Sequence, residues 1–409
     1  MNKQITKDNG QNTKNKMGEK FPEGFLWGVA YSSHQVEGNN NNNDWWEWEQ
    51  KGKAKDKSGK ACDSWNLYET DHDLARDLGC GGFRLSLEWS RIEPKEGEFS
   101  QEAIEHYRKV LQDIRRKGMK TVVTLWHWPL PLWFSHEYGW HKRESVDYFK
   151  KYCQKAVQEL GSEIDIFITM NEPMVPLSAG FLVGRFPPGK INPWLFRKAK
   201  KNMISAHKEC YRVVKNIHQD LPVGITQLYN YFEPYSDFFL WKFLSKKVAH
   251  WYNYDFLDKI DGYQDFVGLD YYFHDKIKLS FKAPFYQQNE NEKVSDLGWE
   301  IYPRGIYEIT KDAWQRYQKP IYILENGLAD KEDKYRKEFI ENHLKRLHGA
   351  IEEGADVRGY FHWSLIDNFE WLEGFEPRFG LCEMNYDTME RKIRPSARRY
   401  AEICKNNAL

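Results

Sequence analysis

Residues 164–173 read IDIFITMNEP, an apolar run that ends abruptly in an amide, a carboxylate and a proline. Proline has no N–H to donate to a central strand, so the strand is expected to stop before Pro173. A carboxylate at the end of a buried strand costs free energy unless a neighbour neutralises it or a reaction uses it. The stretch therefore predicts a buried strand that ends at Glu172 in a functional site.

Seven other short apolar runs recur along the chain, with long amphipathic segments between them. Residues 100–118, 143–161 and 335–354 show the i, i+3/i+4 apolar spacing of a helix and close on a glycine. Eight strand-then-helix units predict an α/β protein built as a single (β/α)8 barrel, the TIM barrel. The eight predicted strands span residues 25–30, 82–87, 121–126, 164–170, 223–228, 266–269, 321–324 and 357–363.

The barrel is predicted to occupy residues 20–409 as one catalytic domain, because no repeat or linker divides this part of the chain. Residues 1–19 are polar and rich in Lys and Asn, which predicts a disordered lead-in. Lys+Arg and Asp+Glu both number 60, so the net charge offers no global attraction to nucleic acid or to an anionic membrane. No apolar run reaches the length of a membrane span, and no hydrophobic leader precedes the first proline.

The cysteines and the aromatic residues indicate the compartment and the kind of partner. The six cysteines are dispersed, without a CxxC pair or a histidine at metal-ligand spacing. We expect reduced thiols in a cytoplasmic protein, with no metal and no other cofactor. Aromatic residues make up 16% of the chain, more than core filling usually needs. Sugars present apolar C–H faces between hydroxyls, so a small carbohydrate is the expected partner; the oligomeric state stays open.

Two carboxylates stand at strand ends, which is where such a barrel places its active site. Glu172 ends the fourth predicted strand in TMNEP, and Glu325 ends the seventh in ILENG. Facing each other across the barrel, they could cleave a glycosidic bond: one protonates the leaving oxygen, and the other attacks the anomeric carbon or activates water. A strand-end glutamate is also a common salt-bridge partner. The same position in both strands, each beside an asparagine, favours catalysis.

Several motifs, found in order between residues 21 and 400, resemble glycoside hydrolase family 1, the family of β-glucosidases and β-galactosidases. They read FLWGVAYSSHQVEG, RLSLEWSRIEP, TLWHWPLP, TMNEP, GLDYY, GWEIYPRG, ILENG and HWSLIDNFEWLEGFEPRFGL. The resemblance implies a retaining β-glycosidase, foremost a β-glucosidase, that acts from the nonreducing end by double displacement. Glu172 would be its general acid/base and Glu325 its nucleophile.

The same resemblance implies roles for ten further residues. Arg84 and Tyr272 would contact the nucleophile and keep it ionised. Trp363 would form a stacking floor under the sugar, Phe379 a wall, and Trp299 a platform near the aglycone. The hydroxyls of the nonreducing sugar would be bound by Gln35, His127, Asn171, Glu370 and Trp371.

Some of these residues have a purely structural alternative. Trp299 and Phe379 could merely pack loops, and His127 could be a core histidine, although its place between two tryptophans favours the site. The other histidines on helical patterns are expected at the surface: His207, His218, His343 and His348.

Two other functions stay open from the sequence. A 6-phospho-β-glycosidase would need cations near the sugar's 6-position, whereas Glu370 and the segment after it are mainly acidic. A noncatalytic sugar-binding barrel would have lost a carboxylate, and both are present. A metal hydrolase is disfavoured because there is no HExxH motif. The family commonly has Asn where this chain has Asp270, so the added carboxylate either raises the pKa of Glu325 or pairs with a cation.

Overall fold

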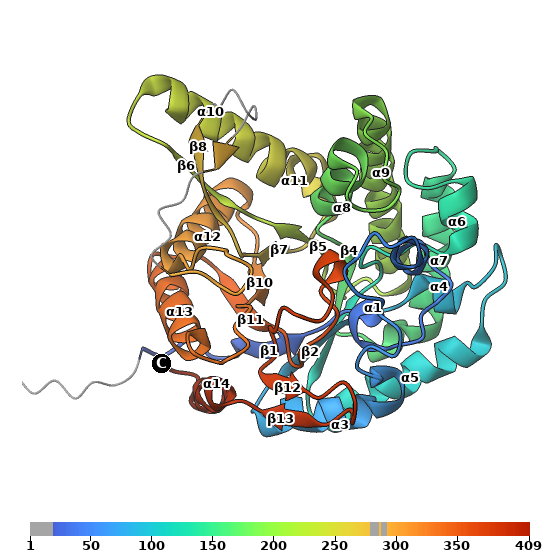
Figure 1. Cartoon of the computed structure of the whole chain (residues 1–409), viewed down its shortest axis with the longest axis horizontal. Coiled ribbons are helices and arrows are strands. Elements are labelled where there is room, and N and C mark those ends of the chain that lie inside the picture. Colours follow the sequence, from blue (N-terminus) through green and yellow to red (C-terminus); the bar gives the residue numbers. More distant parts are fainter. Residues whose placement is uncertain (1–18, 279–285, 288–292) are drawn as a thin grey trace, which may run out of the picture.

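The computed structural model describes residues 19–278, 286–287 and 293–409, and its centre is a closed barrel of eight parallel strands (Figure 1). The strand order around the barrel is β1-β11-β10-β7-β5-β4-β3-β2. This confirms the predicted (β/α)8 fold. Residues 1–18 of the predicted disordered lead-in lie outside the described residues. The barrel strands are β1 (Leu26–Ala30), β2 (Gly82–Ser86), β3 (Lys120–Thr124), β4 (Ile166–Asn171), β5 (Val223–Leu228), β7 (Val267–Asp270), β10 (Ile321–Asn326) and β11 (Val357–Trp363).

Each predicted apolar run is one of these strands, and the ends shift by no more than two residues. The agreement has a physical cause, because helices cover a parallel barrel outside and side chains fill it inside. Such strands read as continuous apolar runs. Inside, a buried cluster fills the barrel with Val122, Ile168, Phe266, Leu324 and Phe361.

The helices surround the barrel (Figure 1), and their buried apolar side chains form one hydrophobic core with those of the strands. The three predicted from periodicity are α5 (Gln101–Arg116), α7 (Ser145–Leu160) and α13 (Arg336–Glu352). Ser100 caps α5 by accepting a hydrogen bond from the N–H of Ala103 at 3.2 Å. Further helices are α3 (Ser64–Asp77), α9 (Pro193–Ile217), α11 (Asp255–Ile260), α12 (Pro303–Tyr317) and α14 (Pro395–Asn406).

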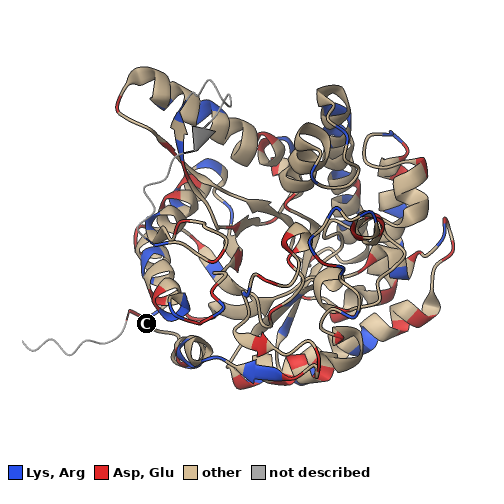
Figure 2. Ribbon diagram, in the orientation of Figure 1, with Lys and Arg blue, Asp and Glu red and all other residues tan. Residues whose placement is uncertain are grey.

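Short elements follow the strand ends and build the rim above the barrel. They are α1 (Ser33–Val36), α2 (Asp44–Gln50), α4 (Trp89–Ile92), α6 (Leu132–Glu137), α8 (Met174–Ser178), α10 (Phe239–Ala249), β6 (Tyr231–Pro234), β8 (His274–Lys278), β9 (Tyr286–Gln287), β12 (Cys382–Met384) and β13 (Arg391–Ile393). Acidic and basic residues alternate over the outer helices (Figure 2), as a zero net charge leads one to expect.

The prediction that the helix histidines lie at the surface is wrong for three of the four. His207 is fully buried, and its ring nitrogens lie 2.7 Å from Thr169 Oγ1 and 2.8 Å from the carbonyl of Tyr263. His343 and His348 are also buried, and only His218 is half-buried. A histidine on a helix is buried when its face of the helix turns toward the barrel, and it then needs a polar partner there.

All six cysteines are buried and unpaired. Across the described ranges, every helix is too short or too polar to span a bilayer.

Candidate active site

A cavity of about 440 Å³ opens at the carboxyl ends of the barrel strands. It brings together residues from seven separate motifs of the sequence. Its deep end is almost inaccessible, since Asn171 and Gln35 are fully buried there. The lining includes all the predicted site residues except Arg84: Gln35, His127, Asn171, Glu172, Tyr272, Trp299, Glu325, Trp363, Glu370, Trp371 and Phe379.

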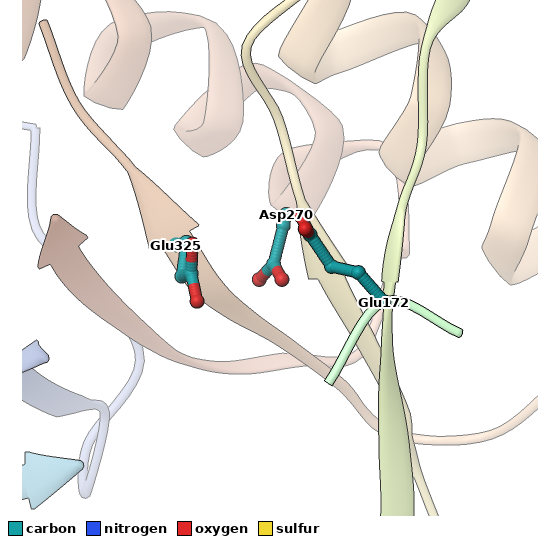
Figure 3. A group of neighbouring side chains, drawn as sticks. All are labelled: Glu172, Asp270 and Glu325. Atoms are coloured by element: carbon teal, nitrogen blue, oxygen red, sulfur yellow. The ribbon is translucent and has the colours of Figure 1, made fainter. Parts of the chain in front are cut away.

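Both glutamates line this cavity, and Figure 3 shows their side chains on either side of Asp270. One carboxyl oxygen of Glu172 and one of Glu325 lie within 4.8 Å of each other. Where one carboxylate attacks the sugar directly, the two carboxyl groups lie about 5–5.5 Å apart. Where a water molecule attacks instead, they lie about 6.5–9.5 Å apart to leave room for it. The separation here therefore fits direct attack. Glu172 itself has a left-handed backbone with φ of 42°. Such a conformation costs a non-glycine residue about 1–3 kcal/mol and is found mainly at functional sites.

Glu325 is held by a cation and a hydroxyl. Nη1 of Arg84, from β2, lies 2.6 Å from Oε1 of Glu325, and the Tyr272 hydroxyl donates to Oε2 at 3.0 Å. Burial raises the pKa of the Glu325 carboxyl, and Arg84 and Tyr272 counteract that rise. Arg84 also donates to the carbonyl of Leu324 and to Oδ1 of Asn171. It lies beneath the cavity floor, so it supports Glu325 without facing a ligand.

Glu172 has a different environment. Burial and the charge of Glu325 raise the pKa of the Glu172 carboxyl well above its usual range, and Arg84 offsets only part of this rise. Since Arg84 and Tyr272 bond directly to Glu325, the surroundings favour the proton on Glu172 and the negative charge on Glu325. Two carboxyl groups whose surroundings separate their pKa values are the arrangement of a general acid beside a nucleophile.

Asn171 and His127 form a fixed pair beside the glutamates. Oδ1 of Asn171 accepts from Thr226 Oγ1 at 2.7 Å and from Arg84, and its Nδ2 lies 3.1 Å from Nε2 of His127. Burial and the nearby Arg84 charge lower the pKa of His127 well below its usual value. A neutral imidazole thus faces the cavity, able to donate or accept one hydrogen bond.

A second polar group lines the deep end. Nε2 of Gln35 donates to Asn368 Oδ1 and to the carbonyl of Phe369, at 3.0 and 2.8 Å. Glu370 accepts from the indole N–H of Trp363 at 3.3 Å. Burial raises the pKa of Glu370 to about 8, and the charge of Glu325 adds to this. Arg378, the cation in the segment after Glu370, has other partners: its guanidinium lies 3.5 Å from a carboxyl oxygen of Asp367 and over the ring of Tyr386.

Aromatic rings surround these polar groups. The ring of Trp371 packs 4.7 Å from Trp128 and 4.6 Å from Trp45, and it lies nearly parallel to His127. Its backbone is left-handed, with φ of 53°. Packing against three rings holds the Trp371 indole in one orientation at the cavity wall.

The outer part of the cavity is mainly apolar. Trp299 packs 4.6 Å from Phe273 and 6.0 Å from Phe379, so both predicted aromatic residues pack loops and line the cavity as well. An exposed ion pair, Arg185 to Glu373 at 3.6 Å, lies among these side chains. The other outer lining residues are Val175, Val183, Phe186, Leu297 and Leu372.

Sequence reasoning missed several lining residues. Trp128 stands in the quoted motif TLWHWPLP, so that motif could have identified it; its backbone is left-handed, with φ of 85°, in the segment after β3. Tyr252 and Phe186 come from segments without any motif, and only their position in space brings them to the cavity.

Asp270 ends β7 and completes a group of three carboxylates with Glu172 and Glu325 (Figure 3). It is the sole group in the described chain whose oxygens have the mutual spacing of metal ligands, all within 4.8 Å. Arg84 already supplies a positive charge to this group. Of the two alternatives for Asp270, pairing with a cation is wrong for the described residues, where no N–H or O–H donates to either of its oxygens.

Comparison with known proteins agrees with this geometry. The profile of glycosyl hydrolase family 1 matches residues 17–260 and 253–409. Beta-glucosidase A of Thermotoga maritima is 33% identical over 96% of this chain and 99% of its own length. A beta-galactosidase of Saccharolobus solfataricus is 30% identical over 95% of this chain and 96% of its own.

Solved structures of glycosidases also resemble this chain over nearly its full length. A beta-glycosidase from Pyrococcus horikoshii superposes with a TM-score of 0.91 at 40% identity, over 96% of both chains. The Thermotoga maritima beta-glucosidase in complex with glucoimidazole has a TM-score of 0.91 at 31% identity, over 96% of this chain and all of that one. The match of fold, motifs and full length leads to one assignment: this chain belongs to glycosyl hydrolase family 1.

Proposed function

We propose that this protein is a retaining β-glycosidase that releases the nonreducing sugar, with β-glucosides as main substrates and β-galactosides as a second class. The observation that carries the proposal is the pair of glutamates, which lie within 4.8 Å of each other and of which Glu325 is bonded to Arg84 and Tyr272. The names of the family relatives, beta-glucosidase and beta-galactosidase, support the substrate class.

The reaction proceeds in two steps. In the first, Glu172 gives its proton to the glycosidic oxygen while Glu325 attacks the anomeric carbon; the carbon–oxygen bond breaks, the aglycone leaves as an alcohol, and a glycosyl ester forms. In the second, the Glu172 carboxylate takes a proton from water, whose oxygen attacks the same carbon and releases Glu325. Arg84 and Tyr272 stabilise Glu325 as a carboxylate at the start and at the end of this cycle.

The deep, closed end of the cavity supports exo cleavage, because it accommodates a terminal sugar but no continuing chain. Gln35 and Glu370 offer hydrogen-bonding groups there, and the indole of Trp363 offers a flat apolar face. Glu370 offers no positive charge to a sugar 6-phosphate at this end and repels it once its carboxyl, whose pKa is about 8, is ionised. A noncatalytic role would leave the differing states of Glu172 and Glu325 without a use.

The apolar outer cavity supports aryl or alkyl aglycones. Leu297, Phe273 and Phe186 would cover such a group, and each buried CH₂ contributes about 0.8 kcal/mol.

We also propose that the protein works in the cytoplasm. Six buried free thiols suit a reducing compartment, in which disulfides are rare. Fractionation of the host cells tests this, and activity in the culture medium would contradict it.

The test of the function is a panel of p-nitrophenyl β-glycosides with the anomer followed by NMR. We expect the highest kcat/KM for the glucoside or the galactoside, and the β-anomer as the first product. An α-anomer released first, or no hydrolysis of any β-glycoside, would overturn the proposal.

A further inference from the structure

Asp270 lies beside both glutamates yet has no role in the mechanism above. It pairs in register with Glu325 across β7 and β10, and its side chain lies between Glu172 and Glu325 (Figure 3). It is fully buried. A carboxylate in such a place needs a hydrogen-bond partner or a proton of its own.

The contacts of Asp270 leave another carboxyl group as its hydrogen-bond partner. Neither oxygen receives a hydrogen bond from an N–H or O–H within the described chain, and both are shielded from solvent. The carboxyl oxygens of Glu172 and Glu325 are its polar neighbours, within 4.8 Å. The two carboxyl oxygens of Glu325 already accept hydrogen bonds, one from Arg84 and one from Tyr272. Two carboxyl groups in direct contact are joined by a proton between them, and the pair that remains for such a contact is Asp270 and Glu172.

We propose that Asp270 is a positioning residue that shares one proton with Glu172, so that the two side chains titrate as a unit and set the alkaline limit of the reaction. This inference rests on the proposed function. In the active form the pair carries one proton, which Glu172 delivers to the leaving group. Removing that proton would leave three anions together against one cation, Arg84, so the pair retains it to higher pH than a single glutamate would.

The surroundings agree with a proton held in this pair. Burial and the charge of Glu325 raise the pKa of Asp270 well above its usual range, Arg84 lowers it, and Glu172 raises it. The other ionisable groups around the three carboxylates are the phenols of Tyr252 and Tyr272, both with raised pKa values, and the carboxyl of Glu370. None of these supplies a second cation.

The test is Asp270→Asn, which keeps the shape of the side chain and removes its charge. With p-nitrophenyl β-glucoside and other substrates that need acid assistance, we expect the alkaline limb of kcat/KM to move at least about one pH unit lower. With 2,4-dinitrophenyl β-glucoside, whose leaving group needs no proton, the variant should leave that limb unchanged. This dependence on the leaving group separates proton sharing from a merely structural effect.

Asp275→Asn is the matched control. Asp275 is another buried aspartate, five residues further on, and burial raises its pKa to about 7, but its carboxyl accepts from Asn230. We expect this variant to keep the wild-type pH profile with both substrates. Asp270→Ser serves as a second neutral variant in case the asparagine protein does not fold.

An alkaline limb that stays in place, or moves upward, in a folded Asp270 variant would overturn the proposal. So would a uniform loss of rate at every pH with both substrates, since that is the signature of a packing defect. Failure of the underlying function is recognised separately, because the unmodified protein would then hydrolyse no β-glucoside.

Discussion

Replacing Arg84 by methionine should move the acid limb of the pH profile upward. Arg84 is buried, and its guanidinium lies 2.6 Å from Glu325 while also donating to Leu324 and Asn171. Methionine keeps an unbranched apolar stem in place of the arginine stem, so the change removes chiefly the charged guanidinium and these hydrogen bonds. Glu325 must be ionised to attack the sugar, and it would lose its one nearby cation among the described residues.

The size of the effect follows from the geometry. Two unit charges about 4 Å apart interact by about 4 kcal/mol at an effective dielectric constant of about 20, which corresponds to about 3 pKa units. Water that enters in place of the guanidinium stabilises the charged Glu325 carboxylate and so makes the pKa shift smaller. Since Arg84 lowers the pKa of Glu325, its loss raises that pKa, and we expect the acid limb of kcat/KM to rise by about two units. Leaving Glu325 unpaired should also reduce the free energy of unfolding, by about 3–5 kcal/mol.

The assay is kcat/KM for p-nitrophenyl β-glucoside across the pH range, with thermal unfolding measured in parallel. Arg391→Met is the matched control, because Arg391 forms an equally buried pair with Asp71 at 2.8 Å, away from the cavity. That variant should lose stability while its pH limbs stay in place. If folded Arg84→Met protein kept its acid limb within about 0.3 unit of the unmodified protein, the assignment of Arg84 as the group that keeps Glu325 ionised would be wrong.

Three further outcomes are expected. With azide, Glu325→Gly should form an α-glucosyl azide, whereas Glu172→Ala should spare dinitrophenyl glucoside and form the β-azide; the same anomer from both, seen by NMR, would contradict the assigned roles. 6-Phosphoglucoside should have a kcat/KM at least about tenfold below that of glucoside, or about 1.4 kcal/mol; the gap should widen above pH 8 as Glu370 ionises, and narrow in Glu370→Ser. A kcat/KM that favours the phosphorylated substrate would refute this reasoning. Gly327→Ala would place a Cβ 1.8 Å from the carbonyl of Trp363, so calorimetry should show a loss of about 1–3 kcal/mol, whereas Gly262→Ala, with open space around it, should be nearly neutral.

Much of the fold can be read from local sequence, because its signals are local. A barrel strand buried on both faces is an apolar run wherever it occurs, as Val223–Leu228 and Val357–Trp363 show with their predicted bounds unchanged. Glu172 and Glu325 could be found for the same reason, since strand ends are where such a barrel exposes polar groups. The order of the motifs along the chain was sufficient to identify the family.

The state of each group depends on the closed barrel, which brings distant residues together and excludes water from them. Arg84 precedes Glu325 by 241 residues, yet they form one ion pair. Local sequence contains no signal for whether His207 faces the barrel or solvent, because a helix pattern alone leaves its orientation undetermined. The same holds for Asp270: its sequence marks it as unusual, and only the packing of β7 against β10 puts its carboxyl beside Glu172 instead of a cation. The chain's local chemistry thus determined the strands and the two glutamates, whereas burial and long-range contacts decided the partners of each carboxyl group and the direction in which its pKa shifts.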